Sequence, residues 1–232
     1  MIYRRVGKPP CVDKKIFFNG RPLSQLHEVR YLGFQLDCNL SWKNHSDLVA
    51  AKVARGLGIL RRLKHVLPLP VLLLLYHTIV APYISYGCVL WSSNFYANFK
   101  RVQILQNKTV RLLGNYVENV NDTASCFKKL RVLNIGQIRD YQAAVFAYRC
   151  CNDVCPPVFT SFFRVNRSLH GYETREADNF IVEYRDTTRA AFGIRYLAPA
   201  IWNDIPAGIR EAEHIGLFKV NLKTKHLLEV GR

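Results

Sequence analysis

The stretch that decides the fold covers residues 28–67 and reads EVRYLGFQLDCNLSWKNHSDLVAAKVARGLGILRRLKHVL. It opens with β-branched, aromatic and apolar side chains, which is the composition of a β-strand. From Trp42 onward the apolar residues recur every three or four positions, the spacing of one face of an α-helix. Polar residues separate the two patterns, and Asn39 or Ser41 is suited to cap the helix. We therefore predict a strand followed by a helix over residues 41–67.

The predicted helix is apolar on one side and basic on the others. Its cations, against the single acid Asp47, are Lys43, Lys52, Arg55, Arg61, Arg62 and Lys64. Spacings of three and seven residues place Lys52, Arg55 and Arg62 on one face. Such a row fits phosphates, but charge runs on helices are also ordinary solvated surface. The row alone leaves both interpretations open.

The whole chain is strongly basic. Its 232 residues include 33 Lys and Arg against 17 Asp and Glu, a net charge of +16, and 49% are hydrophobic. This composition indicates a folded protein with a polyanionic partner, either nucleic acid or an anionic membrane, although a basic surface without a partner is the plain alternative. The chain opens with no apolar leader. Its seven cysteines, an odd number, are typical of reduced thiols, so we expect a cytoplasmic or nuclear protein.

Residues 66–99 contain no Lys, Arg, Asp or Glu, so a membrane span has to be considered. Prolines and polar residues interrupt this segment, and the unbroken apolar run over residues 71–75 is too short to cross a bilayer. Pro70 suits the first turn of a helix. We predict no membrane span, but a helix from Pro70 to about Ser85 that is buried all round, Leu74 included, at the centre of a helical core.

The rest of the chain reads as further short elements. Asn19-Gly20 is a strong hairpin-turn signal between two N-terminal strands. Apolar periodicity and helix-stop signals predict helices over residues 98–113, 121–130, 135–153, 158–163, 199–204 and 218–228. Strands over 180–184 and 192–196 would form a short β-hairpin near residues 180–197. The predicted fold class is mainly α, a helical bundle preceded by a small N-terminal β-hairpin.

Several short motifs follow one another along the chain. They are YLG at 31–33, LSWKNH at 40–45, PYISYGCVLW at 82–91, LQN at 105–107, HGYETR at 170–175 and AIWNDIP at 200–206. Each motif is weak alone. The ordered set resembles the non-LTR retrotransposon reverse transcriptases of the jockey-like kind, and it covers nearly the whole chain.

The resemblance implies three parts and a function. Residues 1–40 would be a remnant of the polymerase palm with a primer-grip-like hairpin, residues 41–115 a thumb-like helical domain, and residues 116–232 a C-terminal helical segment of unknown role. The partner would be the RNA–DNA template–primer duplex, together with the palm and fingers of the same polyprotein. The implied binding residues are Tyr31, Leu32 and Gly33 at the primer grip and Lys43, Lys52, Arg55 and Arg62 on the thumb helix. Gly33 would let a primer backbone approach closely.

Catalytic groups are not evident in this sequence. Polymerisation needs paired carboxylates that hold two metal ions, and the resembling family holds Mg²⁺ in its palm with one Asp and an F-A-D-D turn. This chain has no Asp-Asp pair, and Asp13, Asp37 and Asp47 occupy turn or cap contexts. We therefore predict no catalytic residue and no cofactor here, and no polymerase activity from the chain alone.

The one zinc-like grouping is a cysteine cluster with a later histidine: Cys150, Cys151, Cys155 and His170. Structural zinc sites usually close with a second pair of ligands, which is absent, so we predict no metal site. Two other assignments stay open beside the reverse transcriptase. One is a free-standing basic helical module that binds nucleic acid or protein. The other is a membrane-associated protein that uses residues 66–90.

Overall fold

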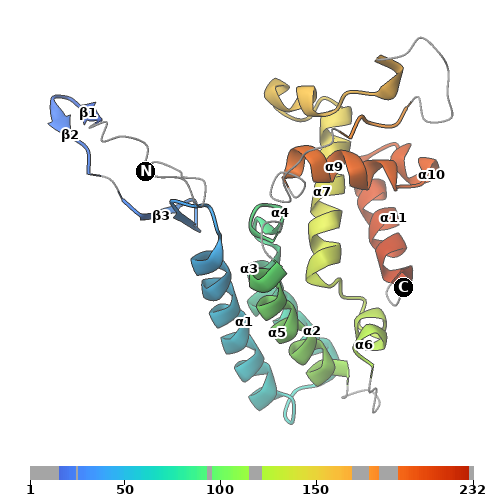
Figure 1. The fold of residues 1–232 in the computed structure, drawn as a ribbon. Coiled ribbons are helices and arrows are strands. Elements are labelled where there is room, and N and C mark those ends of the chain that lie inside the picture. Colours follow the sequence, from blue (N-terminus) through green and yellow to red (C-terminus); the bar gives the residue numbers. More distant parts are fainter. Residues whose placement is uncertain are drawn as a thin grey trace.

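The computed structural model describes residues 16–24, 26–92, 96–114, 122–168, 178–182 and 193–229. Two small antiparallel hairpins precede a helical body (Figure 1). The elements are β1 (Phe17–Phe18), β2 (Arg21–Pro22), β3 (Glu28–Tyr31), β4 (Phe34–Asp37), α1 (Lys43–Leu63), α2 (Leu69–Ile79), α3 (Ala81–Ser85), α4 (Cys88–Trp91), α5 (Tyr96–Gly114), α6 (Thr123–Lys129), α7 (Ile135–Cys151), the 3₁₀ helices η1 (Pro157–Phe162) and η2 (Asn166–Ser168), α9 (Ile194–Asn203), α10 (Ala207–Arg210) and α11 (Ile215–Leu228). The predicted mainly α fold with an N-terminal hairpin is confirmed.

Both hairpins turn on two residues with positive φ. Asn19 and Gly20 (φ 49° and 75°) join β1 to β2, as their sequence predicts. Leu32 and Gly33 (φ 46° and 81°) join β3 to β4, so the YLG motif ends one strand and makes a turn, and does not lie in one continuous strand. The reason is local: paired left-handed residues match the twist of the two flanking strands.

Asp37 organises the start of α1. Its carboxylate accepts hydrogen bonds from the backbone N–H groups of Asn39, Ser41 and Trp42 at 3.0–3.1 Å. Partial burial would raise the pKa of Asp37, but these hydrogen bonds outweigh it, and the pKa is lowered. Ser41 Oγ in turn accepts from the N–H of Lys43 at 3.3 Å. Asp37 is thus the structural turn residue that its sequence context indicates, and α1 starts two residues later than predicted.

Two hydrophobic clusters meet along α7. The first packs β4, the helices α1 to α6 and the start of α7 around Tyr76, Trp91 and Leu60. The second packs the rest of α7 against α9, α10 and α11, where the rings of Tyr148 and Phe218 stack with centroids 4.4 Å apart. The first cluster includes Cys126 to Ile135, so α6 packs with the helices that precede it.

The predicted all-round buried helix over residues 70–85 is wrong in two respects. It breaks at Val80 into α2 and α3, because the ring of Pro82 would clash with the carbonyl four residues earlier in a continuous helix. Of the α2 side chains only Leu72 and Tyr76 are buried, while Leu74 is 63% exposed. An uncharged helix can therefore lie at the surface. Among the residues that the structure describes, no helix is both long and apolar enough to span a membrane.

The predicted hairpin near residues 180–197 is also wrong in the part that the structure describes. Phe180 makes only an isolated bridge with Val165, and the chain is already helical at Ile194. The Asn203 side chain satisfies the Phe180 backbone instead, accepting from its N–H and donating to its C=O, both at 2.8 Å. Residues 183–192 lie outside the described part. The predicted helix around Trp202 is confirmed as part of α9.

Replacement of Leu72 by Ala should lower the free energy of unfolding by about 2–5 kcal/mol, because Leu72 is fully buried and its truncation leaves a cavity. Replacement of Leu74 by Ala or by Asp should change it by no more than about 0.5 kcal/mol, because that side chain is largely in water. Urea denaturation followed by circular dichroism compares the two positions. A loss at Leu74 as large as that at Leu72 would contradict this packing of α2.

Candidate nucleic-acid interface

Three of the sequence motifs meet where the β3–β4 hairpin docks on the helices. Phe34 of β4 lies at the centre of an aromatic cluster. Its ring stacks on Tyr86 with centroids 4.9 Å apart, and it lies 5.9 Å from the ring of Trp42 and 5.3 Å from that of His45. Trp91 completes the cluster, 5.7 Å from His45. The motif residues therefore hold a β-hairpin against a helical body.

Tyr86 and Gly87 anchor the tip of this hairpin. The Tyr86 hydroxyl donates a 2.6 Å hydrogen bond to the carbonyl of Leu32. A Cβ at Gly33 would lie 3.4 Å from the Tyr86 ring, so the tyrosine covers the turn closely. Gly87 has φ +56°, and a Cβ there would come within 2.2 Å of the Phe34 ring. Only glycine combines that backbone conformation with that close approach.

His45 is a packing residue of the cluster. It is buried, and its Nδ1 accepts a 3.4 Å hydrogen bond from the backbone N–H of Gln35. Burial lowers the pKa of His45, and the positive charge of Lys52 lowers it further. The imidazole is therefore neutral and joins β4 to α1. These contacts give His45 a packing role in the cluster.

The binding residues suggested by the sequence do not all lie together. Tyr31 and Leu32 at the hairpin tip are 61% and 69% exposed. Lys52 turns toward α3, where its ammonium lies 4.6 Å above the centre of the Tyr83 ring. At 100° per residue, Lys43 lies about 180° around α1 from Lys52, so these two cations occupy opposite sides of the helix.

Arg55 and Arg62 project from the exposed side of α1. They lie within about 20° of each other around the helix axis, which follows from their separation of seven residues. Of the four lysines and arginines singled out on α1, these two form one row on the solvent side. Lys43 and Lys52 flank that row on either side of the helix.

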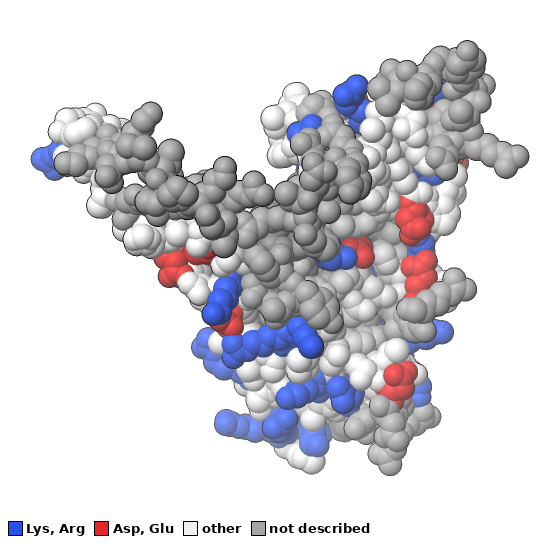
Figure 2. All heavy atoms as spheres, in the orientation of Figure 1, with Lys and Arg blue, Asp and Glu red and all other residues white. Residues whose placement is uncertain are grey.

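A second set of cations lies on α5, beside α1. Figure 2 shows Lys and Arg gathered over the face where these two helices run next to each other. The exposed cations of α5 are Lys100, Arg101, Lys108 and Arg111. Arg101 forms a 2.5 Å ion pair with Asp47, which bridges the two helices. The sequence predicts α5 as a basic amphipathic helix, but nothing in it identifies α1 as its neighbour.

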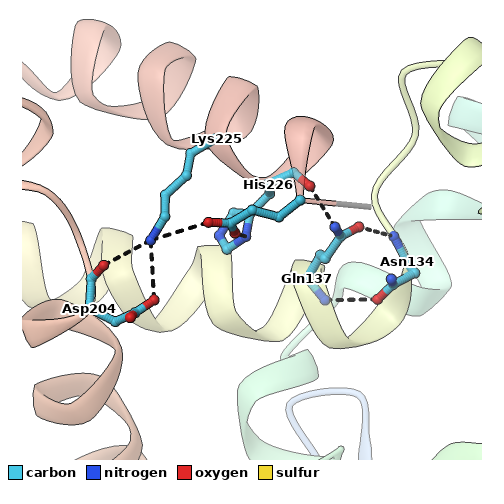
Figure 3. A network of polar contacts seen from close by, with 6 residues as sticks. Asn134, Gln137, Asp204, Lys225 and His226 are labelled. Atoms are coloured by element: carbon cyan, nitrogen blue, oxygen red, sulfur yellow. Dashed lines mark hydrogen bonds and ion pairs between the residues drawn. The ribbon is translucent and has the colours of Figure 1, made fainter. Parts of the chain in front are cut away.

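A polar network lies on another side of the molecule, lining a cavity of about 700 Å³ between α5, α7, α9 and α11 (Figure 3). Lys225 donates to the backbone carbonyl of Asp204 at 2.9 Å and to its carboxylate at 3.2 Å. Gln137 donates to the carbonyl of His226 at 2.7 Å and forms a capping box with Asn134. These contacts fasten α11 to α7 and α9. Because of these contacts the Lys225 side chain is only 15% exposed.

The described residues include no group of three His, Cys, Asp or Glu side chains placed to hold a metal ion. Burial, with Cys155 close by, raises the pKa of the Cys150 thiol, so it stays protonated and packs as a small apolar residue. Cys151 is exposed and Cys155 is half-buried. His170, the fourth member of the zinc-like pattern, lies outside the described residues.

The folded state should lose stability as the pH falls below about 6.5, in part because of His45. Its pKa is lowered by folding from the usual 6.5, so the unfolded chain binds the proton more tightly and acid favours unfolding. His45→Phe should show a shallower decline than the parent between pH 7 and pH 5 in thermal melts. His65→Gln, which removes an exposed histidine, should decline like the parent. Equal slopes for the parent and His45→Phe would count against this assignment.

Comparison with known proteins agrees with the resemblance that the motifs suggest. A stretch of 114 residues is 33% identical to the "Probable RNA-directed DNA polymerase from transposon X-element" of Drosophila melanogaster. It covers 47% of this chain and 12% of that protein. No protein-family model matches the chain, and no solved structure matches it. The resemblance to retrotransposon reverse transcriptases is confirmed: about half of this chain is similar in sequence to part of a transposon RNA-directed DNA polymerase.

Proposed function

We propose that this chain serves as the duplex-gripping part of a retrotransposon reverse transcriptase, with the palm and fingers supplied by other regions of the same polyprotein. In this proposal residues 1–40 belong to the edge of the palm, residues 41–115 act as the thumb, and residues 116–232 form a C-terminal segment. The observation that carries the proposal is the junction around Phe34. It holds an exposed hairpin tip and a basic helix in one rigid unit, on residues of the motifs shared with that family.

The hairpin tip would contact the primer strand. Tyr31 and Leu32 expose an aromatic ring and an apolar side chain, and both suit contacts with bases or sugars. Gly33 contributes indirectly, because its positive φ makes the turn that the Tyr86 ring covers. The group that lies close to Gly33 in the structure is the Tyr86 ring of this chain. The part of Gly33 in primer binding would be to shape the turn.

The basic side of α1 would bind the phosphate backbone. Lys52, Arg55 and Arg62 follow one another along about ten residues of helix, or about 15 Å. Phosphate contacts of this kind position a protein on a duplex without reading its sequence, which suits an enzyme that copies any template. Lys43, near the hairpin and on the side of α5, would contact the duplex from the other edge of α1. A protein with an RNA–DNA duplex as its ligand works in the cytoplasm or the nucleus.

The chain should bind an RNA–DNA hybrid with little sequence preference and with an affinity that falls steeply with salt. The triple variant Lys52→Ala, Arg55→Ala, Arg62→Ala should reduce the slope of log affinity against log salt by roughly two to three, about one for each lost phosphate contact. A matched control removes three exposed cations elsewhere, Arg149, Arg164 and Lys223. Fluorescence anisotropy over a salt series gives the slopes, and circular dichroism checks the fold. A triple variant with the parent's affinity and slope would make this face ordinary solvated surface.

Purified chain should give no primer extension on an RNA or DNA template with Mg²⁺ or Mn²⁺. The physical reason is that the sequence offers no Asp-Asp pair to hold the two metal ions of the reaction. A complete reverse transcriptase with the same primer and template serves as the positive control. Incorporation of labelled nucleotide by the pure chain would refute the division of labour proposed here.

A further inference from the structure

We infer that α5 is the second half of the nucleic-acid interface, and that α1 and α5 bind the two opposite strands of one duplex. The inference deepens the proposed function and rests on it. It adds a row of cations from a second helix, none of which belongs to the motifs, and it makes the interface selective for a duplex over a single strand. The juxtaposition that points to it is the parallel packing of two basic helices whose exposed sides face the same way.

The two helices run side by side in the same direction (Figure 1). Asp47 in the second turn of α1 pairs with Arg101 in the second turn of α5, which fixes their register. Both helices bury their opposite sides in the same hydrophobic cluster, through residues such as Val53 of α1 and Val102 of α5. Their exposed sides therefore form one continuous face, the α1–α5 face, and this is the face on which Figure 2 shows the basic side chains.

Each helix contributes its own row. On α1 the row is Arg55 and Arg62, both on the solvent side. On α5, Lys108 and Arg111 are exposed, and Lys100 and Arg101 extend the row toward the hairpin end. The α5 row is about 16 Å long, from eleven residues at 1.5 Å each. Between them α1 and α5 carry a single acid, Asp47, so the face keeps a large excess of positive charge.

The separation of the rows matches a duplex. Packed helices lie about 8–10 Å apart, and side chains on their outer faces reach somewhat further. The grooves of nucleic-acid duplexes are about 6–12 Å wide, and the A-like form adopted with RNA has a wide, shallow minor groove. Two cation rows at this spacing reach the two backbones that border one groove. A single strand has one backbone and engages one row at a time.

The edge of α1 that faces α5 carries one short side chain midway between Asp47 and Arg61, seven residues from each. Ala54 lies two turns after Asp47 and therefore on the same edge of α1, which faces α5. It is exposed and has a short side chain. A carboxylate at this point would lie between the two backbones and repel both. A substitution at position 54 thus tests whether a duplex occupies the space between the two rows, and it leaves every cation in place.

The experiment measures binding of the full chain to an RNA–DNA hybrid and to its RNA strand alone, over a salt series. The variants are the α5 pair Lys108→Ala with Arg111→Ala, the α1 pair Arg55→Ala with Arg62→Ala, and the four changes combined. For the hybrid we expect each pair to lower the log–log salt slope by roughly two and the combination by roughly four. For the single strand the α5 pair should lower the slope by less than one. The control pair Arg149→Ala with Lys223→Ala should match the parent.

Each outcome decides a different point. If the α5 pair binds the hybrid like the parent while the α1 pair does not, the inference about α5 is overturned and the proposed function stands. If the α5 pair weakens hybrid and single strand equally, α5 makes a simple phosphate contact, and the two-strand arrangement is overturned. If neither pair has an effect, the proposed function fails together with the inference.

A second measurement guards against misfolding of the multiple variants. Ala54→Glu should weaken hybrid binding at least tenfold at low salt, and Ala54→Gln, which has nearly the same size without the charge, should bind within threefold of the parent. Circular dichroism and thermal melting of both variants should agree with the parent, because residue 54 is exposed on a helix. Equal hybrid affinity of the two variants would overturn the placement of a duplex across the α1–α5 face.

Discussion

The packing of the Phe34 ring is the interaction on which the rest of this structure depends. The β3–β4 hairpin has only four residues in each strand, and a two-stranded hairpin of this size is barely stable alone in water. Phe34 supplies what the hairpin lacks, because it stacks on Tyr86 and lies against Trp42 and His45. Trp42 and His45 come from the start of α1, and Tyr86 comes from the corner between α3 and α4. The hairpin, the start of α1 and the α3–α4 corner are therefore held as one unit.

This junction gives the motifs of the sequence a physical meaning. A short motif that recurs in a family of polymerases invites a catalytic interpretation, but here its residues pack, turn and hydrogen-bond. Gly33 and Gly87 adopt left-handed backbone conformations, and Gly87 also makes room for the Phe34 ring. Tyr86 donates to the backbone of the turn that it covers. Most motif residues thus specify how the hairpin is presented, and the proposed contacts with nucleic acid use the exposed residues in and beside the motifs.

Charge is distributed unevenly over the fold. The α1–α5 face collects arginines and lysines with one acid, and that acid is used to tie the two helices together. On another side, Asp204 and Glu229 surround Lys225, and the network fastens α11 to the second hydrophobic cluster. Asp204 thus serves a tertiary contact, while Glu229 pairs with Lys225 within one turn. The α1–α5 face carries a dense group of positive charges, which favours long-range attraction of a polyanion.

The sequence by itself determined the elements whose signals are local. Apolar periodicity predicts α1, α5 and α7, and Asn19-Gly20 predicts its turn, because each signal depends only on residues a few positions apart. Only the tertiary structure decided which sides of these elements are covered. Leu74 is apolar yet exposed because none of the described helices packs on that side of α2, and Lys225 is charged yet mostly covered because Asp204 lies opposite it. The pairing of α1 with α5 joins residues 54 positions apart through Asp47 and Arg101, and no local pattern encodes such a contact.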